Sequence, residues 1–175
     1  MTALGIVHLT SAFASMGVGA AVLLVTPKGS RRHRQLGWTY VASMLVLNGT
    51  ALAIYRLFGT FGPFHFAALI SLATIVAGTI VARAAGRARR ARDPMRRERM
   101  VSLHYRFMTF SYVGLVAAFA SESITRVPAF RVMAGGPGPM FGFAVLGATL
   151  LVFGVGAWFI HTRLDAALVP FRHPR

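Results

Sequence analysis

The stretch that decides the fold is His104–Arg126, HYRFMTFSYVGLVAAFASESITR. It is apolar through its middle, yet it has a histidine at one end and the carboxylate of Glu122 near the other. Steps of three and four residues lead from His104 to Glu122, so both lie on one face of a helix. At about 1.5 Å per residue they are about 27 Å apart, close to the thickness of a bilayer's hydrocarbon core. Ionisable groups at such depth normally face the interior of a helix bundle.

The composition indicates a membrane protein. Of the 175 residues 55% are hydrophobic and 13% are charged, and the charges lie between long apolar runs, whereas a soluble domain carries about 25% charged residues. We expect no nucleic-acid partner for the net charge of +15, because the arginines flank the apolar runs, where topology and anionic lipid headgroups account for them. The chain has no cysteine, which excludes disulfides and thiolate metal sites.

The apolar runs predict an all-α fold, a polytopic membrane helix bundle of about five transmembrane helices that forms a single transmembrane domain over residues 1–175. The predicted spans cover residues 4–26, 37–58, 64–85, 100–125 and 140–161, and a tail follows over 162–175. Each span has about 20 residues or more, enough to cross a membrane as a helix. We expect the first four to form a four-helix core, set apart from the fifth by a flexible loop over 131–140. The basic segment 86–99 is predicted to be a ragged loop or an interfacial helix.

Basic residues predict the orientation. Sixteen of the nineteen Lys and Arg residues lie within 28–34, 83–106 and 163–175, which these spans place on one side. By the positive-inside rule we expect the N-terminus outside and the C-terminus in the cytoplasm, in a multi-pass protein of the plasma membrane. We expect Lys28, Arg32 and Arg34 to contact anionic lipid headgroups, although a quinone headgroup or a haem propionate would suit this segment equally well.

The predicted topology sorts most of the histidines into two levels. The outer level contains His8 and His65, together with Glu122. The inner level contains His33, His104 and His161, while His173 lies in the tail. Such a layout agrees with three classes of function.

The first class is electron transfer across the membrane through b-type haem, because a pair of neutral imidazoles from facing helices can ligate such a haem in a membrane bundle. His8 and His65 would then hold an outer haem, and His33 and His104 an inner one. A quinone would be a suitable redox partner. The weak point is His33, which we expect to lie in a loop.

The second class is a proton- or metal-handling transporter, in which His8, His65 and Glu122 bind a divalent transition metal or relay protons. The third is an accessory membrane subunit without chemistry of its own, working beside another membrane subunit. In that case the histidines lie among headgroups and Glu122 pairs with Arg126, one helical turn away. The sequence does not decide whether the chain is an enzyme.

Polar and small residues inside the spans predict helix packing. Asn48 lies mid-span and is expected to hydrogen-bond a neighbouring helix. Ser11 either lines a polar cavity or bonds back to a helix carbonyl. Three small pairs at a spacing of four residues predict close helix approach; they are Gly17–Ala21, Gly78–Ala82 and Gly114–Ala118.

The chain also resembles a known family of small predicted bacterial membrane proteins, domain of unknown function two thousand three hundred and six. The resemblance runs from the first span through the fourth and rests on His8, Gly17, Lys28-Gly29, His33-Arg34, Gly37, Tyr40, Met44, Phe64-His65, His104, Met108, Ser111-Tyr112, Gly114-Leu115, Ala118, Glu122 and Arg126. It implies a bundle of membrane helices with no established activity. It also suggests that the four histidines among these residues and Glu122 belong together, in a layout similar in outline to the di-haem membrane cytochromes.

Overall fold

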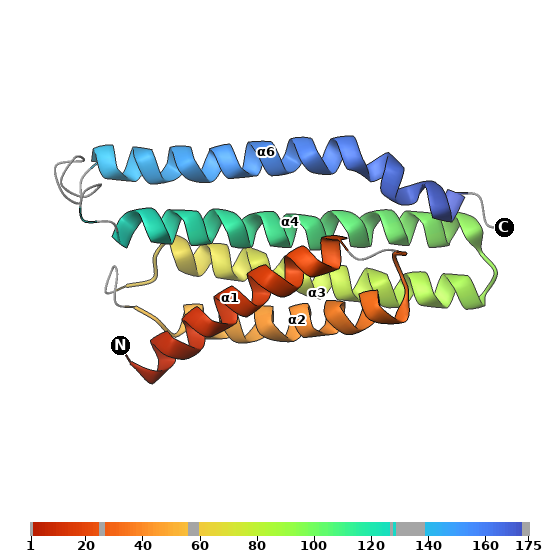
Figure 1. The fold of residues 1–175 in the computed structure, drawn as a ribbon, viewed down its shortest axis with the longest axis horizontal. Coiled ribbons are helices and arrows are strands. Elements are labelled where there is room, and N and C mark those ends of the chain that lie inside the picture. Colours follow the sequence, from red (N-terminus) through yellow and green to blue (C-terminus); the bar gives the residue numbers. More distant parts are fainter. Residues whose placement is uncertain (1, 25–26, 56–59, 127, 129–138, 173–175) are drawn as a thin grey trace. The chain divides into compact units, whose positions relative to one another are not determined.

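The computed structural model describes residues 2–24, 27–55, 60–126, 128 and 139–172. Within these ranges the chain is helical and contains no strand. The helices are α1 (Ala3–Leu24), α2 (Arg31–Leu52), α3 (Pro63–Arg90), α4 (Pro94–Arg126) and α6 (Pro139–Arg172) (Figure 1). The prediction of an all-α protein is confirmed.

The first of two compact units, Met1–Ile75, contains α1, α2 and the first part of α3. Helices α1 and α2 pack on each other in this unit (Figure 1). Asn48 of α2 is buried and donates from Nδ2 to Ser71 Oγ of α3 at 3.1 Å and to Met44 O at 2.8 Å. The predicted interhelical role of Asn48 is thereby confirmed.

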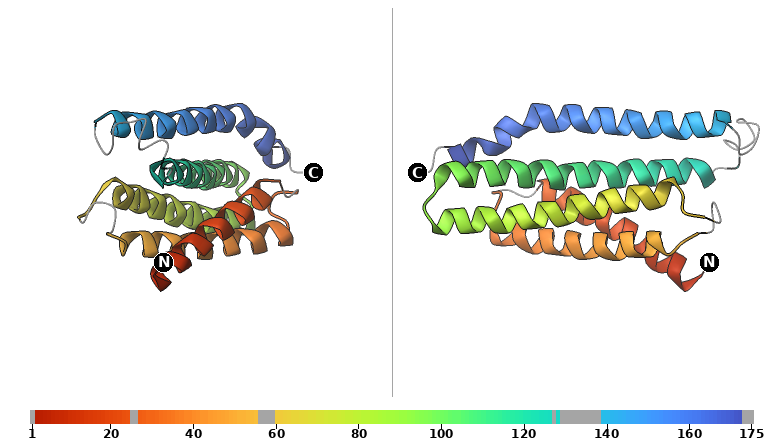
Figure 2. Two further views of the ribbon diagram at one scale, coloured as in Figure 1. Left: turned by 60° about the vertical axis from the view of Figure 1, so that its left-hand side comes forward. Right: turned by 180° about the vertical axis from the view of Figure 1, so that it is seen from behind.

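The second unit, Val76–Arg175, contains the rest of α3 together with α4 and α6. Helices α4 and α6 lie side by side over much of their length (Figures 1 and 2). Their backbones come close at Gly156, where an added Cβ would lie 2.5 Å from both γ-methyl carbons of Val113. The hydroxyls of Ser121 and Thr149 are 2.6 Å apart across the same pair. The fifth predicted span therefore packs on the fourth within one unit.

Local sequence sets where the helices begin. Helices α3, α4 and α6 each start at a proline, whose fixed φ suits the first turn and whose missing N–H is no loss there. Ser30 caps α2 by accepting from the His33 backbone N–H at 3.2 Å, and Asp93 caps α4 by accepting from the Arg96 N–H at 2.9 Å.

The second predicted span is shifted in the structure. Residues 37–58 were expected to be helical, but α2 begins at Arg31 and ends at Leu52, because Ser30 caps the arginine-rich segment and draws it into the helix. Positions 56–58 of that span, like 25–26 of the first, lie outside the described residues. Among the described residues four helices are long and apolar enough to cross a membrane, namely Ala3–Leu24, Pro63–Arg90, Pro94–Ile124 and Val145–Arg163. A crossing by α2 stays a prediction.

The basic segment 86–99 is mostly helical. Of the two predicted alternatives the ragged loop is therefore wrong, and the position of these helical turns at the membrane interface stays a prediction. Helix α3 continues to Arg90 and α4 starts at Pro94, because arginine is a good helix former. The turn between them places Arg92 at φ 55° and closes with a 3.0 Å hydrogen bond from Asp93 N–H to Ala88 O, the pattern of a Schellman motif. The predicted loop over 131–140 falls almost wholly on residues 131–138, which lie outside the described ones, as does His173.

Close helix approach is confirmed at one of the three predicted small-residue pairs. A Cβ added to Gly78 would lie 2.6 Å from Met108 Sδ and 3.3 Å from Phe107 Cβ. At Gly114 the nearest atom, on Phe153, would be at an ordinary 3.8 Å, and Gly17 has nothing within 4 Å. Close approach at Gly17–Ala21 therefore stays a prediction.

Candidate functional site

His104 lies on α4 and contacts the backbone of α3. Its Nδ1 is 2.9 Å from the carbonyl oxygen of Gly78. Since a carbonyl oxygen can only accept, Nδ1 carries the proton and Nε2 of the neutral ring carries the lone pair. The contact depends on the absence of a side chain at Gly78, where Met108 already fills the space that a Cβ would need. His104 is thus a half-buried imidazole whose Nε2 is an acceptor or a metal ligand.

His65, in the first turn of α3, has the opposite arrangement. It is 3% exposed, and its Nδ1 accepts from the backbone N–H of Gly62 at 3.0 Å. Nδ1 therefore holds the lone pair and Nε2 holds the proton. Nε2 is buried and has no hydrogen-bond partner among the described residues, which for a buried donor costs about 1–3 kcal/mol. The rings of Tyr55 and Phe61 lie against this imidazole, with centroids 4.5 and 4.8 Å away.

His8 on α1 contacts Thr50 on α2 within the first unit, with Nδ1 and Oγ1 3.0 Å apart. The Thr50 hydroxyl is also 2.9 Å from Val46 O and 2.8 Å from Leu47 O, so its single proton goes to the helix backbone. Oγ1 then accepts from Nδ1–H, and Nε2 of His8 carries the lone pair, as in His104.

His33 occupies the third position of α2, and the prediction that it lies in a loop is wrong. Its backbone N–H donates to Ser30 Oγ, which is why the helix includes it. His161 is exposed on α6, and Glu122 is half-buried on α4. The predicted ion pair of Glu122 with Arg126 falls on a side chain outside the described part of the chain.

The sequence predicts two kinds of ligand set, a metal site and two haem-ligating histidine pairs. Within the described residues, no group of three or more His, Asp or Glu side chains is placed to hold a metal ion. His8 and His65 belong to the first unit and Glu122 to the second, so their joint metal site stays a prediction, as do the haem pairs. The proton on Nε2 of His65 does not suit ligation through that nitrogen, because a ligating nitrogen must offer its lone pair.

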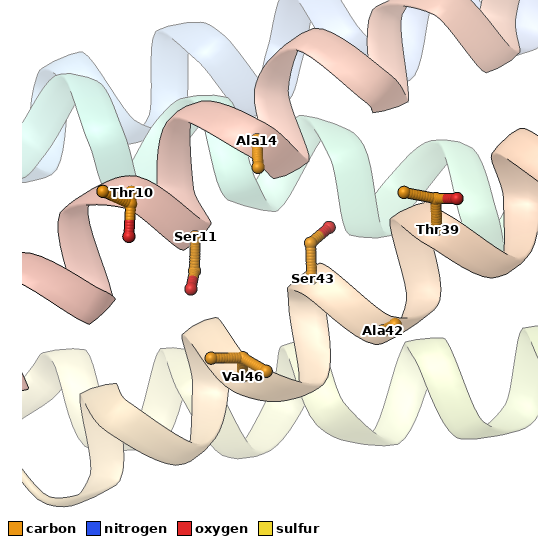
Figure 3. Close-up of a pocket in the computed structure, with 7 residues that line it drawn as sticks. All are labelled: Thr10, Ser11, Ala14, Thr39, Ala42, Ser43 and Val46. Carbon is orange, nitrogen blue, oxygen red and sulfur yellow. The ribbon is translucent and has the colours of Figure 1, made fainter.

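A groove runs between α1 and α2, and Ser11, one of whose two predicted roles is to line a cavity, is among its lining residues (Figure 3). Its volume is about 380 Å³, and the lining side chains are small or β-branched; they are Thr10, Ser11, Ala14, Thr39, Ala42, Ser43 and Val46. Ser11 donates to Val7 O at 2.7 Å, as one of its two predicted roles requires. No titratable group lines the groove, so it offers shape but no acid–base chemistry.

Lys28, in the connection before α2, differs in its contacts from Arg32 and Arg34 in the first turn of α2. Lys28 Nζ donates to Val22 O at 3.0 Å and to Leu23 O at 2.7 Å, and it thus satisfies carbonyls at the end of α1. Burial lowers the pKa of Lys28 below its ordinary value. Arg32 and Arg34 are exposed on the first turn of α2. Headgroup contact by all three stays a prediction, but Lys28 already has a structural role.

The long apolar helices define a polytopic α-helical membrane protein. The family model described as "Predicted membrane protein (DUF2306)" matches residues 5–161, so the chain belongs to this family. The match confirms the resemblance seen in the sequence. No curated protein and no solved structure matches the chain.

Sequence reasoning missed Gly62, Tyr55 and Phe61 as neighbours of His65. The signal that points to Phe61 and Gly62 is local, because both lie with His65 in the segment 61–66, FGPFHF, whereas Tyr55 lies outside this segment. Gly78 was predicted as a packing residue, yet its carbonyl also sets the protonation of His104. Such a backbone contact leaves no mark in the sequence.

Proposed function

We propose that this protein transfers electrons in the membrane and holds b-type haem through His104. The observation that carries the proposal is the 2.9 Å contact between His104 Nδ1 and Gly78 O. Histidines that ligate metals generally donate their other ring N–H to a carbonyl or carboxylate, which fixes the tautomer and makes the ligating nitrogen more basic. His104 has this arrangement on a helix that is long and apolar enough to span a membrane.

The residues fit the cofactor to different degrees. His104 directs its Nδ1 proton to an oxygen, so its Nε2 offers a lone pair to iron, while ligation by His8 stays a prediction. His33 lies on a regular helix, which removes the objection that it belongs to a loop. His65 does not fit in its observed hydrogen bonding, and we therefore leave it out of the proposed ligands. When bound, haem would supply one-electron chemistry, and the chain's part is to hold and orient it.

The test is an absorption spectrum of the detergent-purified protein, oxidised and then reduced with dithionite, from cells supplied with haem during expression. We expect sharp reduced bands of b type, lost in His104→Ala and weakened or lost in His33→Ala. His161→Ala is the matched control, because that histidine is exposed and has no assigned role; it should retain the wild-type spectrum. A featureless spectrum from well-folded protein, or an unchanged one in His104→Ala, would contradict the proposal.

A further inference from the structure

We infer that His65 marks a binding site for a planar, uncharged carbonyl compound of the quinone class, to which Nε2–H donates a hydrogen bond. The first step is the position of the proton. Gly62 N–H donates to Nδ1 at 3.0 Å, so Nε2 of the neutral ring must carry the hydrogen. The imidazole is 3% exposed, and Nε2 has no partner among the described residues. A buried donor without an acceptor is rare in native proteins and calls for one.

The second step is the shape of what surrounds this donor. Tyr55 and Phe61 lie against the imidazole, and Phe66 meets Phe61 edge-on at 5.0 Å. These three rings are themselves 45%, 46% and 60% exposed. The buried imidazole that carries this donor is therefore in contact with two partly exposed aromatic rings, and a third ring contacts one of them. A flat ligand can stack on such rings, or displace one of them, and so bring an acceptor to Nε2.

The third step is charge. His65 is the third residue of α3, at one end of a helix long and apolar enough to span a membrane. Residues 60–82 contain no Lys, Arg, Asp or Glu. A carboxylate or phosphate at this place would find no cation from that segment, and burying its charge would be costly. A neutral carbonyl oxygen on a lipid-soluble ring satisfies the donor, the aromatic rings and the apolar surroundings together.

This inference deepens the proposed function, because a quinone is the kind of lipid-soluble partner that exchanges electrons with a membrane haem. The inference rests on the proposed function because electron transfer gives the reason for a quinone to bind. The observations at His65 that support the site do not depend on haem. Binding of a quinone to the haem-free protein can therefore be measured by itself.

The experiment titrates ubiquinone-1 into haem-free protein in phosphatidylcholine nanodiscs. We expect saturable binding that is weakened about tenfold or more in His65→Ala, since a lost hydrogen bond in an apolar site is worth about one decade of affinity. Binding to His161→Ala, the exposed histidine of α6, should be unchanged. No saturable binding to folded wild-type protein, or equal binding to His65→Ala, would overturn the inference.

Two further measurements keep the test decisive if His65→Ala does not fold. Tyr55→Ala removes a side chain that is 45% exposed, and we expect it to weaken binding several-fold. Wild-type affinity in this folded variant would overturn the aromatic part of the site. In wild-type protein with ¹⁵N-labelled histidine, the Nε2–H signal of His65 should shift in step with the titration. A signal that stays in place would show that the quinone does not meet this donor and would overturn the inference.

The outcomes for haem and quinone are separable. Quinone binding that needs His65, together with a featureless haem spectrum, would leave the site standing and remove the proposed electron transfer. A haem spectrum that needs His104, without quinone binding, would do the reverse.

Discussion

The two units each hold a histidine against a backbone group, and they hold it in opposite senses. In the second unit His104 donates from Nδ1 to the carbonyl of Gly78, whereas in the first unit His65 accepts at Nδ1 from the N–H of Gly62. One imidazole is left with an Nε2 lone pair and the other with an Nε2 proton. The same residue type thus becomes a candidate ligand in one place and a hydrogen-bond donor in the other.

The difference comes from backbone geometry. The carbonyl that meets His104 is within α3, exposed to the ring because Gly78 lacks a side chain. The N–H that meets His65 belongs to Gly62, just before the first residue of α3, where backbone donors have no partner within the helix. A helix interior therefore offers a histidine an acceptor, and a helix start offers it a donor.

The largest effect should come from filling the space at Gly78. Gly78→Leu would drive a side chain into Met108 and Phe107, so we expect a loss of about 1–3 kcal/mol in unfolding free energy and a loss of the His104 contact. Thermal unfolding in detergent measures it. Gly86→Leu on the same helix is the control, because Gly86 has nothing within 4 Å. Equal stability of the two variants would show that α3 and α4 are not in close contact at Gly78.

Asn48 tests the polar core of the first unit. Asn48→Ala removes hydrogen bonds to Ser71 Oγ and Met44 O and leaves a buried gap, and we expect a loss of about 1–2 kcal/mol. Thr39→Ala is the control, because Thr39 is exposed and its hydroxyl donates to Gln35 O of its own helix. Denaturant-induced loss of helical circular dichroism would measure both. A loss no larger than that of Thr39→Ala would mean that this amide does not join α2 to α3.

The N-caps Ser30 and Asp93 allow the two units to be compared, and removing either should lower the free energy of unfolding by less than the changes above. Ser30→Ala in the first unit and Asp93→Ala in the second each remove one capping acceptor, and each should cost about 0.5–1 kcal/mol. Restoring a short acceptor, as in Ser30→Asn and Asp93→Asn, should recover most of the loss. Thermal midpoints of the four variants are the measurement. Alanine variants as stable as wild type would remove capping as the reason why α2 begins at Arg31.

The smallest expected effect is a gain. Arg92 is the one described non-glycine residue with a positive φ, at 55°. Arg92→Gly should stabilise the protein by about 0.5 kcal/mol, because glycine adopts this conformation without strain but costs more chain entropy. Arg90→Gly, in the last turn of α3, should instead destabilise it. Both would be compared by thermal unfolding, and a loss of stability in Arg92→Gly would contradict the structure of this turn.

Much of the fold can be predicted from the hydropathy and hydrogen-bonding needs of individual residues. Apolar runs account for the four helices that, among the described residues, are long and apolar enough to cross a membrane. An amide in mid-span such as Asn48 needs a partner on another helix. The loop prediction for His33 is wrong, and so is the loop alternative for the segment 86–99, because basic residues alone do not mark a loop. His33 and the segment 86–99 are helical because Ser30 and Asp93 cap the helices and because arginine favours helix.

The sequence predicts which residues belong to the candidate site, but it does not predict which ring nitrogen of each histidine carries the proton. The sequence identifies His65 and His104 as ionisable groups in apolar surroundings, but the proton on each ring depends on a backbone atom of Gly62 or Gly78. These contacts are set by a turn and by the approach of two helices. The close approach at Gly156 is hidden for the same reason, since it depends on where Val113 of α4 lies.

The most direct test is the ¹⁵N spectrum of histidine-labelled, haem-free protein at a pH where the rings are neutral, with signals assigned by His65→Asn and His104→Asn. We predict a proton on Nε2 of His65 and on Nδ1 of His104, each seen as a protonated nitrogen shift beside an unprotonated one. The same tautomer at both positions, or the reverse of this pair, would contradict the account of how the two units set their histidines.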